Sequence, residues 1–175
     1  MRKNFIHIFI LALVAGLLSA GTASAENSLR AGAKGLSFGV ANGDIEVSGR
    51  MFLQSDLAIL AGFGFNRLDN DETLTDYALS VGLRKYIGKS DVAPFVGANL
   101  FSRHDDEFTG AGVVTERTVG VEGNFGAEYF FNRQVSAEAR VGLGLEDSSN
   151  HDFNKGADGT AIGTFRSAVG VNIYF

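Results

Sequence analysis

The sequence predicts an all-β protein, folded as an eight-stranded antiparallel up-and-down transmembrane β-barrel. Three observations lead to this fold class. Apolar and polar residues alternate with a period of two from residue 33 onward, and this period is the signature of strands rather than helices. Turn-forming residues divide the alternating part into eight segments. Several segments have about 9–11 residues or more, which is enough to cross a bilayer when the strand is tilted.

The start of the chain has the pattern of a cleaved secretory signal peptide. Arg2 and Lys3 precede an apolar run over residues 5–18, and a small-residue cleavage site ends at Ala25. An uncleaved anchor is the alternative, but the run is shorter than the roughly 20 residues of a membrane-spanning helix. The chain has no Cys, which excludes a lipid-modified cysteine and any disulfide framework. The expected organisation is a signal peptide (1–25), a short N-terminal periplasmic segment (26–32) and a barrel domain (33–175).

Each strand is expected from its own alternation. The clearest case has Tyr77, Leu79 and Val81 on one face, with polar and small residues between them. In the fifth segment the pattern leaves open which face Phe95 and Phe101 occupy. The eight expected strands cover, in order, residues 33–41, 45–53, 57–68, 76–84, 93–103, 119–131, 135–146 and 165–175.

The connections indicate which end of the barrel faces outward. An even number of strands brings both termini to the same side, and secretion of the N-terminus places that side in the periplasm. The longer connections then lie outside the cell, as in outer-membrane barrels generally. The expected periplasmic turns are residues 54–56, 88–92 and 132–134, and the expected outer connections are residues 41–44, 69–72, 104–112 and 147–160.

The polar face of the strands carries glycine, Arg and acidic residues instead of the Lys, Glu and Thr of a water-facing surface. Glycine weakens an exposed strand but suits the crowded interior of an eight-stranded barrel. The planar guanidinium of Arg also suits enclosed ion pairs. We therefore expect Glu128 to contact Arg140 across the turn at residues 132–134. The full expected lumenal charge network is Glu46, Arg50, Asp76, Arg84, Glu122, Glu128, Glu138, Arg140 and Arg166.

The last segment carries a more specific pattern. Its apolar positions are Phe165, Val169, Val171, Ile173 and the terminal Phe175. This pattern resembles the closing-strand signal by which the barrel assembly machinery recognises bacterial outer-membrane barrels. The alternating part of the chain as a whole resembles the small eight-stranded outer-membrane family that includes the OmpX/Ail proteins, the OmpA membrane domain and the neisserial surface barrels. The resemblance implies location in the cell outer membrane, in contact with its lipid and lipopolysaccharide, with functions that vary across the family.

The expected function is non-enzymatic, in envelope integrity or in surface interaction through the outer loops. Phe108 and Phe153 are aromatic residues in polar loops, so they are candidate contacts with an extracellular or host ligand, or else they pack over the barrel mouth. The acidic loop residues lack the spacing of an EF-hand, and no metal or cofactor is expected. The net charge of −5 without a basic run offers no footprint for nucleic acid. We expect a monomer.

Two other functions stay open at this stage. The resembling family includes lipid A deacylases and palmitoyltransferases, which use His and Ser near the outer rim. His104 with Ser102, or His151 with Ser148 or Ser149, would be the base and the nucleophile, although no His-x-Ser-Asn sequence like that of the deacylases occurs. The other function is a soluble periplasmic barrel that turns its apolar face inward around a ligand.

Overall fold

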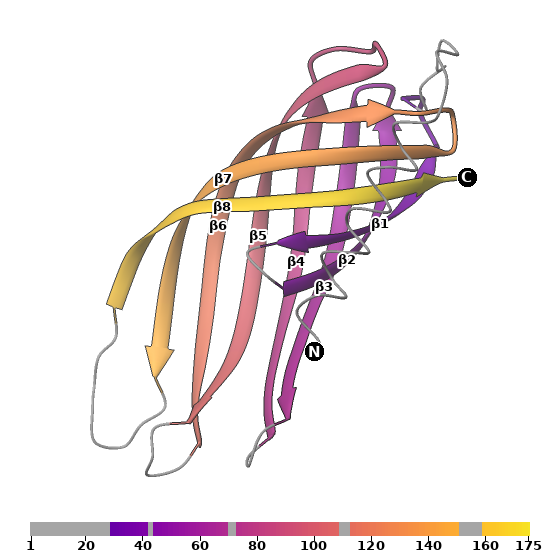
Figure 1. Ribbon diagram of the computed structural model, residues 1–175. Coiled ribbons are helices and arrows are strands. Elements are labelled where there is room, and N and C mark those ends of the chain that lie inside the picture. Colours follow the sequence, from indigo (N-terminus) through magenta and orange to yellow (C-terminus); the bar gives the residue numbers. More distant parts are fainter. Residues whose placement is uncertain (1–28, 42–43, 70–72, 109–112, 151–158) are drawn as a thin grey trace.

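Each of the eight alternating segments forms a strand in the computed structural model, which describes residues 29–41, 44–69, 73–108, 113–150 and 159–175. Neighbouring strands pair antiparallel, and β1 also pairs with β8, which closes the barrel (Figure 1). The predicted eight-stranded up-and-down barrel is therefore confirmed. No helix in the described residues is long and apolar enough to cross a membrane. The strands are β1 (Lys34–Ala41), β2 (Asp44–Gln54), β3 (Leu57–Asp69), β4 (Thr73–Tyr86), β5 (Val92–Phe108), β6 (Val113–Phe130), β7 (Val135–Asn150) and β8 (Gly159–Tyr174).

The two ends of the barrel differ in their connections. One end, which we call the turn end, carries the short connections β2–β3, β4–β5 and β6–β7 together with the start of β1 and the C-terminus (Figure 1). There the amide of Phe175 donates to the carbonyl of Lys34 over 3.0 Å. The opposite end, which we call the loop end, carries the connections β1–β2, β3–β4, β5–β6 and β7–β8.

Most strands continue further toward the loop end than the sequence predicted. β5 reaches Phe108 and β7 reaches Asn150, so the outer connections predicted at residues 104–112 and 147–160 are shorter than expected. Antiparallel pairing uses backbone groups, and it continues where the apolar alternation has ended, for example where Asp105 lies opposite Glu116. β1 and β2 stop earlier, so the wall is lower on that side (Figure 1).

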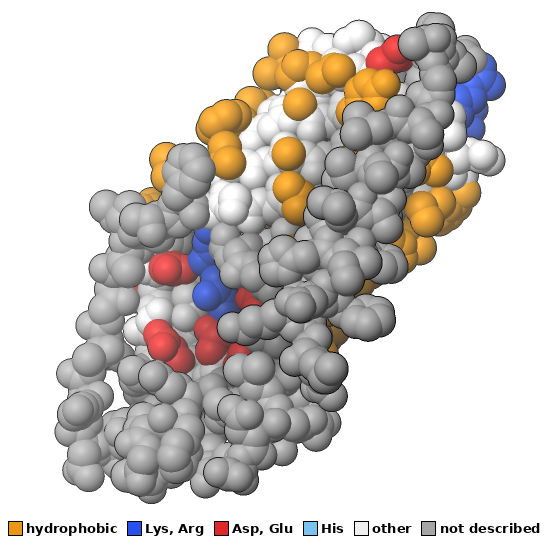
Figure 2. All heavy atoms as spheres, viewed as in Figure 1, with side chains coloured by type: hydrophobic (Ala, Val, Ile, Leu, Met, Phe, Trp, Pro, Cys, Tyr) orange, Lys and Arg blue, Asp and Glu red, His pale blue; other side chains and the backbone are white. Residues whose placement is uncertain are grey.

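Most apolar side chains point outward, and most side chains that point inward are polar or small. Phe125 is 62% exposed, whereas its chain neighbour on the other face, Asn124, is 7% exposed. In Figure 2, hydrophobic side chains are spread over the upper part of the visible surface, and acidic and basic side chains lie toward the lower left and at the upper right. Exposed apolar side chains occur on every strand, and examples in chain order are Phe38, Val47, Phe63, Leu79, Leu100, Phe125, Leu143 and Ile173.

Inward glycines allow neighbouring strands and aromatic rings to approach closely. A Cβ on Gly126 would lie 2.7 Å from the Phe95 ring and 2.9 Å from the Cα of Arg140. Phe101 covers Gly120 in the same way, with its ring 2.5 Å from where a Cβ would lie. Both phenylalanines lie directly opposite their glycine in the β5–β6 ladder and point inward. This answers the facing question that the sequence left open.

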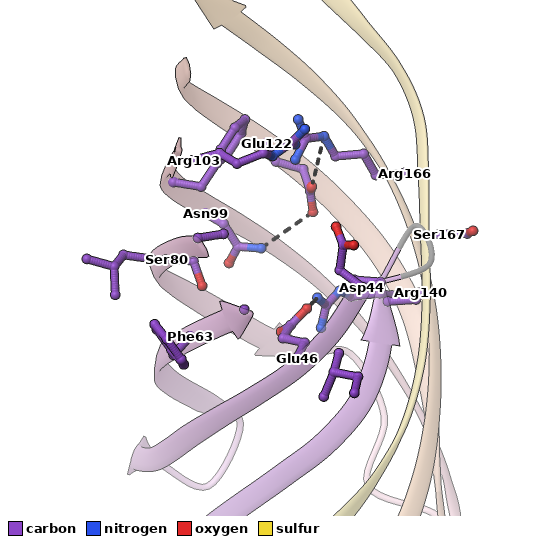
Figure 3. Close-up of a pocket in the computed structure, with 17 residues that line it drawn as sticks. Asp44, Glu46, Phe63, Ser80, Asn99, Arg103, Glu122, Arg140, Arg166 and Ser167 are labelled. Carbon is purple, nitrogen blue, oxygen red and sulfur yellow. Dashed lines mark hydrogen bonds and ion pairs between the residues drawn. The ribbon is translucent and has the colours of Figure 1, made fainter. Parts of the chain in front are cut away.

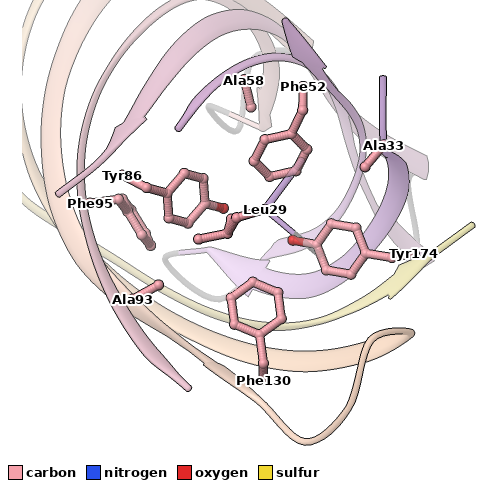
Figure 4. Close-up of a cluster of buried hydrophobic side chains, with 9 residues drawn as sticks. All are labelled: Leu29, Ala33, Phe52, Ala58, Tyr86, Ala93, Phe95, Phe130 and Tyr174. Atoms are coloured by element: carbon pink, nitrogen blue, oxygen red, sulfur yellow. The ribbon is translucent and has the colours of Figure 1, made fainter. Parts of the chain in front are cut away.

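A cluster of buried apolar side chains fills the lumen at the turn end. Leu29, which precedes β1, lies among the rings of Phe52, Tyr86, Phe130 and Tyr174 (Figure 4). The Phe52 and Tyr86 ring centroids are 5.6 Å apart, and those of Phe130 and Tyr174 are 5.7 Å apart. These rings therefore exclude water from the turn end of the lumen, next to the polar groups that lie further inside.

We expect Gly126→Ala to destabilise the barrel by about 1–3 kcal/mol, because the new methyl group would overlap a ring and the backbone of β7. Gly123→Ala, on the outward face of the same strand, is the matched control, since nothing lies within 4 Å of its Cβ position. Urea unfolding of the refolded protein in detergent, followed by far-UV circular dichroism, measures both. Equal stability of the two variants would contradict the close packing described for Gly126.

Candidate functional site in the barrel lumen

Four charged side chains meet in the middle of the lumen, just above the aromatic cluster. Arg50 comes from β2, Arg84 from β4, Glu128 from β6 and Glu138 from β7, each from an inward position of its strand. All four side chains are at most 3% exposed. Two positive and two negative charges therefore neutralise each other in a space that water does not reach.

Arg50 is the centre of this group. Its Nη1 donates to Glu128 Oε2 over 2.9 Å, and its Nη2 donates to Glu138 Oε2 over 2.7 Å. The same guanidinium also donates to the hydroxyl of Tyr174 and to Asn172 Oδ1, over 2.9 Å in each case. Because β2 and β6 lie on opposite sides of the barrel, these bonds span the whole cross-section of the lumen.

Arg84 completes the charge balance through a bidentate pair. Its Nη1 and Nη2 donate to the two oxygens of Glu138 over 2.7 and 3.1 Å, a geometry that is stronger and more directional than a single bond. The guanidinium carbon lies 3.8 Å from the centroid of Phe95. Arg84 thus links the charged layer to the aromatic cluster below it.

Glu128 receives hydrogen bonds on both oxygens. The hydroxyls of Tyr86 and Tyr174 each donate over 2.5 Å, Asn172 Nδ2 donates over 2.8 Å, and the Ser136 hydroxyl donates as well. A fully buried carboxylate needs this many donors to replace the water it has lost.

The ion pairs continue toward the loop end at lower burial. Arg140 donates to Glu46 over 2.6 Å and to Glu138 over 3.3 Å. Arg166 donates to Glu146 over 2.5 Å, and its Nε lies 3.8 Å from Glu122. The lumenal charges therefore form layers from the turn end to the loop end.

A cavity of about 110 Å³ lies among these outer charges (Figure 3). Its wall on β3 and β4 carries inward residues without bulk, namely Gly64, Ala78 and Ser80. Charged and polar side chains face it from β2, β5, β6, β7 and β8: Asp44, Glu46, Asn99, Arg103, Glu122, Arg140 and Arg166. We call this space the outer cavity.

The structure changes one predicted pairing. Arg140 lies opposite Gly126 and is therefore diagonal to Glu128. The predicted contact between Glu128 and Arg140 is nevertheless wrong. Arg140 extends toward the loop end and binds Glu46, while Glu128 extends toward the turn end and binds Arg50. The remaining predicted residue, Asp76, lies nearer the loop end and interacts electrostatically with Asp105.

The structure places only some of the predicted catalytic and surface residues. His104 lies on β5, directly opposite Tyr77, with the two ring centroids 4.7 Å apart, and it is not part of the lumenal network. Phe108 ends β5 opposite Val113 instead of standing in a loop, and its side chain lies outside the described residues, as do His151 and Phe153. The described residues contain no group of three His, Cys, Asp or Glu able to hold a metal ion.

The C-terminal strand keeps the predicted alternation. Val169, Ile173 and Phe175 are exposed at 61, 47 and 69%, and Val171 is half-buried on the same face. The side chain of Phe165 lies outside the described residues. The residues that face inward on β8 include Asn172 and Tyr174, which are not among the expected lumenal charges.

The aromatic and amide members of the network carry no charge, which is why the sequence did not single them out. Tyr86 and Tyr174 each face inward at the turn end, next to the charged layer, and their hydroxyls donate to Glu128. A tyrosine on the polar face of a strand is the signal that could have identified them, since its hydroxyl seeks a partner when buried.

No protein-family model and no curated protein matches the chain. Among solved structures, the chain is similar to the N-terminal β-barrel domain of OprF from Pseudomonas aeruginosa, with a TM-score of 0.59 and 13% identity over 83% of this chain and 98% of that one. It is also similar to Neisserial surface protein A, with a TM-score of 0.54 and 14% identity over 82% of this chain and 94% of that one. These likenesses establish the fold.

We expect Arg50→Met to cost about 3–5 kcal/mol of unfolding free energy, because it leaves Glu128 buried without its closest cation. Lys85→Met is the matched control. It removes the exposed pair of Lys85 with Asp56, in which the hydrogen bond and charge of Lys85 lower the pKa of the Asp56 carboxyl, and exposed pairs contribute little to stability. Urea unfolding in detergent compares the two.

A second variant keeps this test informative if Arg50→Met fails to fold. Arg50→Met combined with Glu128→Gln removes both charges of one pair, so the double variant should be more stable than Arg50→Met alone. Loss of stability in Arg50→Met no larger than in Lys85→Met would contradict the central position of Arg50.

Proposed function

We propose that the protein is a non-enzymatic outer-membrane β-barrel that contributes to envelope integrity or to surface interaction. The observation that carries this proposal is the inverted arrangement of the barrel, with exposed apolar side chains on every strand and ion pairs inside. A wall of this composition is stable in lipid, and a closed barrel leaves no strand edge unpaired there. The shared fold with two bacterial barrels supports the same role.

The lumen favours an anchoring role over transport. Ion pairs and hydrogen bonds join β2 to β4, β6, β7 and β8 across the barrel, and the aromatic cluster fills the turn end. Eight strands leave an interior just wide enough for side chains. A rigid, filled barrel would hold the outer connections at the cell surface, where any recognition would take place.

The proposed surroundings follow from this orientation. The outward wall would contact outer-membrane lipid and lipopolysaccharide, and the exposed apolar residues of β8 would present the assembly signal to the barrel assembly machinery. Phe108 and Phe153 stay candidate contacts for an extracellular or host ligand. The monomer, the absence of a cofactor and the cleaved signal peptide remain predictions from the sequence.

The two alternatives receive less support. A soluble barrel around an apolar ligand would need its apolar face inside, which is the reverse of the observed arrangement. A lipid A-modifying enzyme would need a base aimed at a nucleophile, and His104 instead stacks on Tyr77 outside the charge network. Comparison of lipid A mass spectra from cells with and without the gene distinguishes the enzyme, because altered acylation would support it.

We expect the protein to sediment with the outer membrane on a sucrose gradient and to change its gel mobility on boiling, because a closed barrel stays folded in detergent until it is heated. Recovery of the protein free in the periplasm would contradict the proposal. The mobility change by itself does not test the location, since it reports only that the barrel is folded.

We expect Phe175→Ser to lower the amount of protein assembled in the outer membrane, because it removes the exposed terminal residue of the proposed signal. Ile87→Ser is the control. Ile87 follows β4 at the same end of the barrel and is similarly exposed, at 71% against 69% for Phe175, but it lies outside the C-terminal strand. Equal assembly of the two variants would contradict a role for Phe175 in the assembly signal. It would leave the proposed outer-membrane location unaffected.

A further inference from the structure

We propose that the turn end of the barrel binds the phosphate group of an anionic phospholipid. The site is a groove of about 510 Å³ where β8 ends, which we call the turn-end groove. Arg30, from the segment before β1, and Arg133, from the β6–β7 turn, both line it together with Phe175. The inference rests on the proposed function, because only a barrel in the outer membrane brings its turn end to the leaflet that faces the periplasm.

The backbone that carries Arg30 is anchored to the barrel. The amide of Ala33 donates to the carbonyl of Arg30 over 3.2 Å, which closes a turn. Gly32 within this turn has a φ of +81°, a left-handed conformation that glycine adopts readily. The amide of Gly32 donates to the carbonyl of Phe52 over 2.8 Å. The exposed side chain of Arg30 therefore starts from a fixed place beside β2.

The β6–β7 turn is anchored as well, and it presents donors. Asn132 Oδ1 accepts from the amides of Gln134 and Val135 over 2.7 and 2.9 Å. These two bonds occupy the acceptor atom of the Asn132 amide, so its Nδ2 group can only donate to a ligand in the groove. The amide of Tyr174 donates to the carbonyl of Gln134 over 2.7 Å, which joins the turn to β8. The exposed Arg133 lies within this fixed turn.

The charges at the turn end favour an anion. Asp56 is bound to Lys85 over 2.7 Å, and neither Asp56 nor Asp91 lines the groove. The terminal carboxylate of Phe175 does lie there and accepts from the Lys34 amide over 3.4 Å, so two guanidiniums line the groove against one carboxylate. In Figure 2, basic side chains lie at the upper right, which is the turn end in Figure 1. The described basic residues of this end are Arg30, Lys34, Lys85, Lys89 and Arg133, and its described acidic side chains are Asp56 and Asp91.

The groove is continuous with the apolar wall, which favours a lipid over a soluble anion. Phe175 lines the groove and is also 69% exposed on the outward face, next to the exposed Ile173. Lys34 lies on the outward face of β1, two residues before the exposed Leu36. A lysine in such a place can lay its stem on apolar surface and keep its ammonium group among headgroups. Acyl chains can therefore contact the wall while the phosphate lies in the groove.

The kind of phospholipid follows from the charge. A guanidinium donates two parallel hydrogen bonds to a phosphate, and basic residues near a membrane surface attract anionic lipids. Phosphatidylglycerol carries one negative charge. Phosphatidylethanolamine has the same phosphodiester, but its ammonium group would lie among the basic groups of the turn end. The groove should therefore prefer the anionic lipid.

Native mass spectrometry of the folded protein tests this inference. The protein in detergent micelles receives equal amounts of dioleoyl-phosphatidylglycerol and dioleoyl-phosphatidylethanolamine, which share their acyl chains and their phosphodiester. We expect adducts with phosphatidylglycerol to be at least about tenfold more abundant, since each of two arginines contributes about fivefold. Equal abundance of the two adducts would overturn the proposal, because the basic groups would then have no effect on lipid binding.

Three variants locate the binding site. Arg30→Gln and Arg133→Gln each remove one guanidinium from the groove and should lower the preference for phosphatidylglycerol by about fivefold. Arg103→Gln is the matched control, because it removes the same charge from the lumen at the loop end and should leave the preference unchanged. The change in gel mobility on boiling verifies that each variant is folded. An undiminished preference in both groove variants, or an equal loss in Arg103→Gln, would overturn the proposal.

A last comparison distinguishes a lipid from a soluble phosphate ester. Glycerol 1-phosphate carries the phosphate without acyl chains, and we expect few adducts with it. Adducts as abundant as those of phosphatidylglycerol would overturn the choice of a lipid. Because the measurement is made in detergent, a missing lipid preference overturns this inference alone, whereas recovery of the protein free in the periplasm would contradict the proposed function.

Discussion

The pairing of two arginines with two glutamates across the lumen is the interaction on which the other features depend. Charges inside an eight-stranded barrel have neither bulk water nor space to move, so each must be neutralised by its neighbours. Arg50 and Arg84 bind Glu128 and Glu138 from different strands, which ties together walls that share no ladder. Burial of such pairs does not itself guarantee stability. Its effect is to favour one relative placement of the strands, because any shift would leave a buried charge unpaired.

The glycines and aromatic residues follow from that arrangement. Long side chains that reach across the lumen leave no room for bulk on the walls between them, so inward positions such as Gly126 carry no side chain. At the turn end no described charged side chain crosses the lumen. It is filled instead by rings such as Phe52 and Phe130, which exclude water from the charged layer. At the loop end the small residues of β3 and β4 are not matched by long partners, and the space that results is the outer cavity.

Much of this could be predicted from the sequence because the side-chain period of a strand is two, so one correct phase assigns every residue of that strand to a face. The eight strands and the inward Arg and Glu residues followed from that rule. The partners did not, because Arg50 binds Glu128 across the barrel instead of across a shared ladder. That contact depends on the stagger of all eight strands. The ends of β5 and β7 were underestimated for another reason, since backbone pairing continues through charged residues that give no apolar signal.

The inverted arrangement itself can be tested most directly by spin labels along β6 in lipid vesicles. The chain has no natural Cys, so single cysteines at Val121, Phe125 and Tyr129 can be compared with those at Glu122 and Asn124. Our account predicts frequent collisions with lipid-dissolved oxygen for the first three labels, because these positions face outward, and few for the other two, which face the packed lumen. The reverse pattern, or no alternation, would contradict a barrel with its apolar wall in lipid and its charges inside.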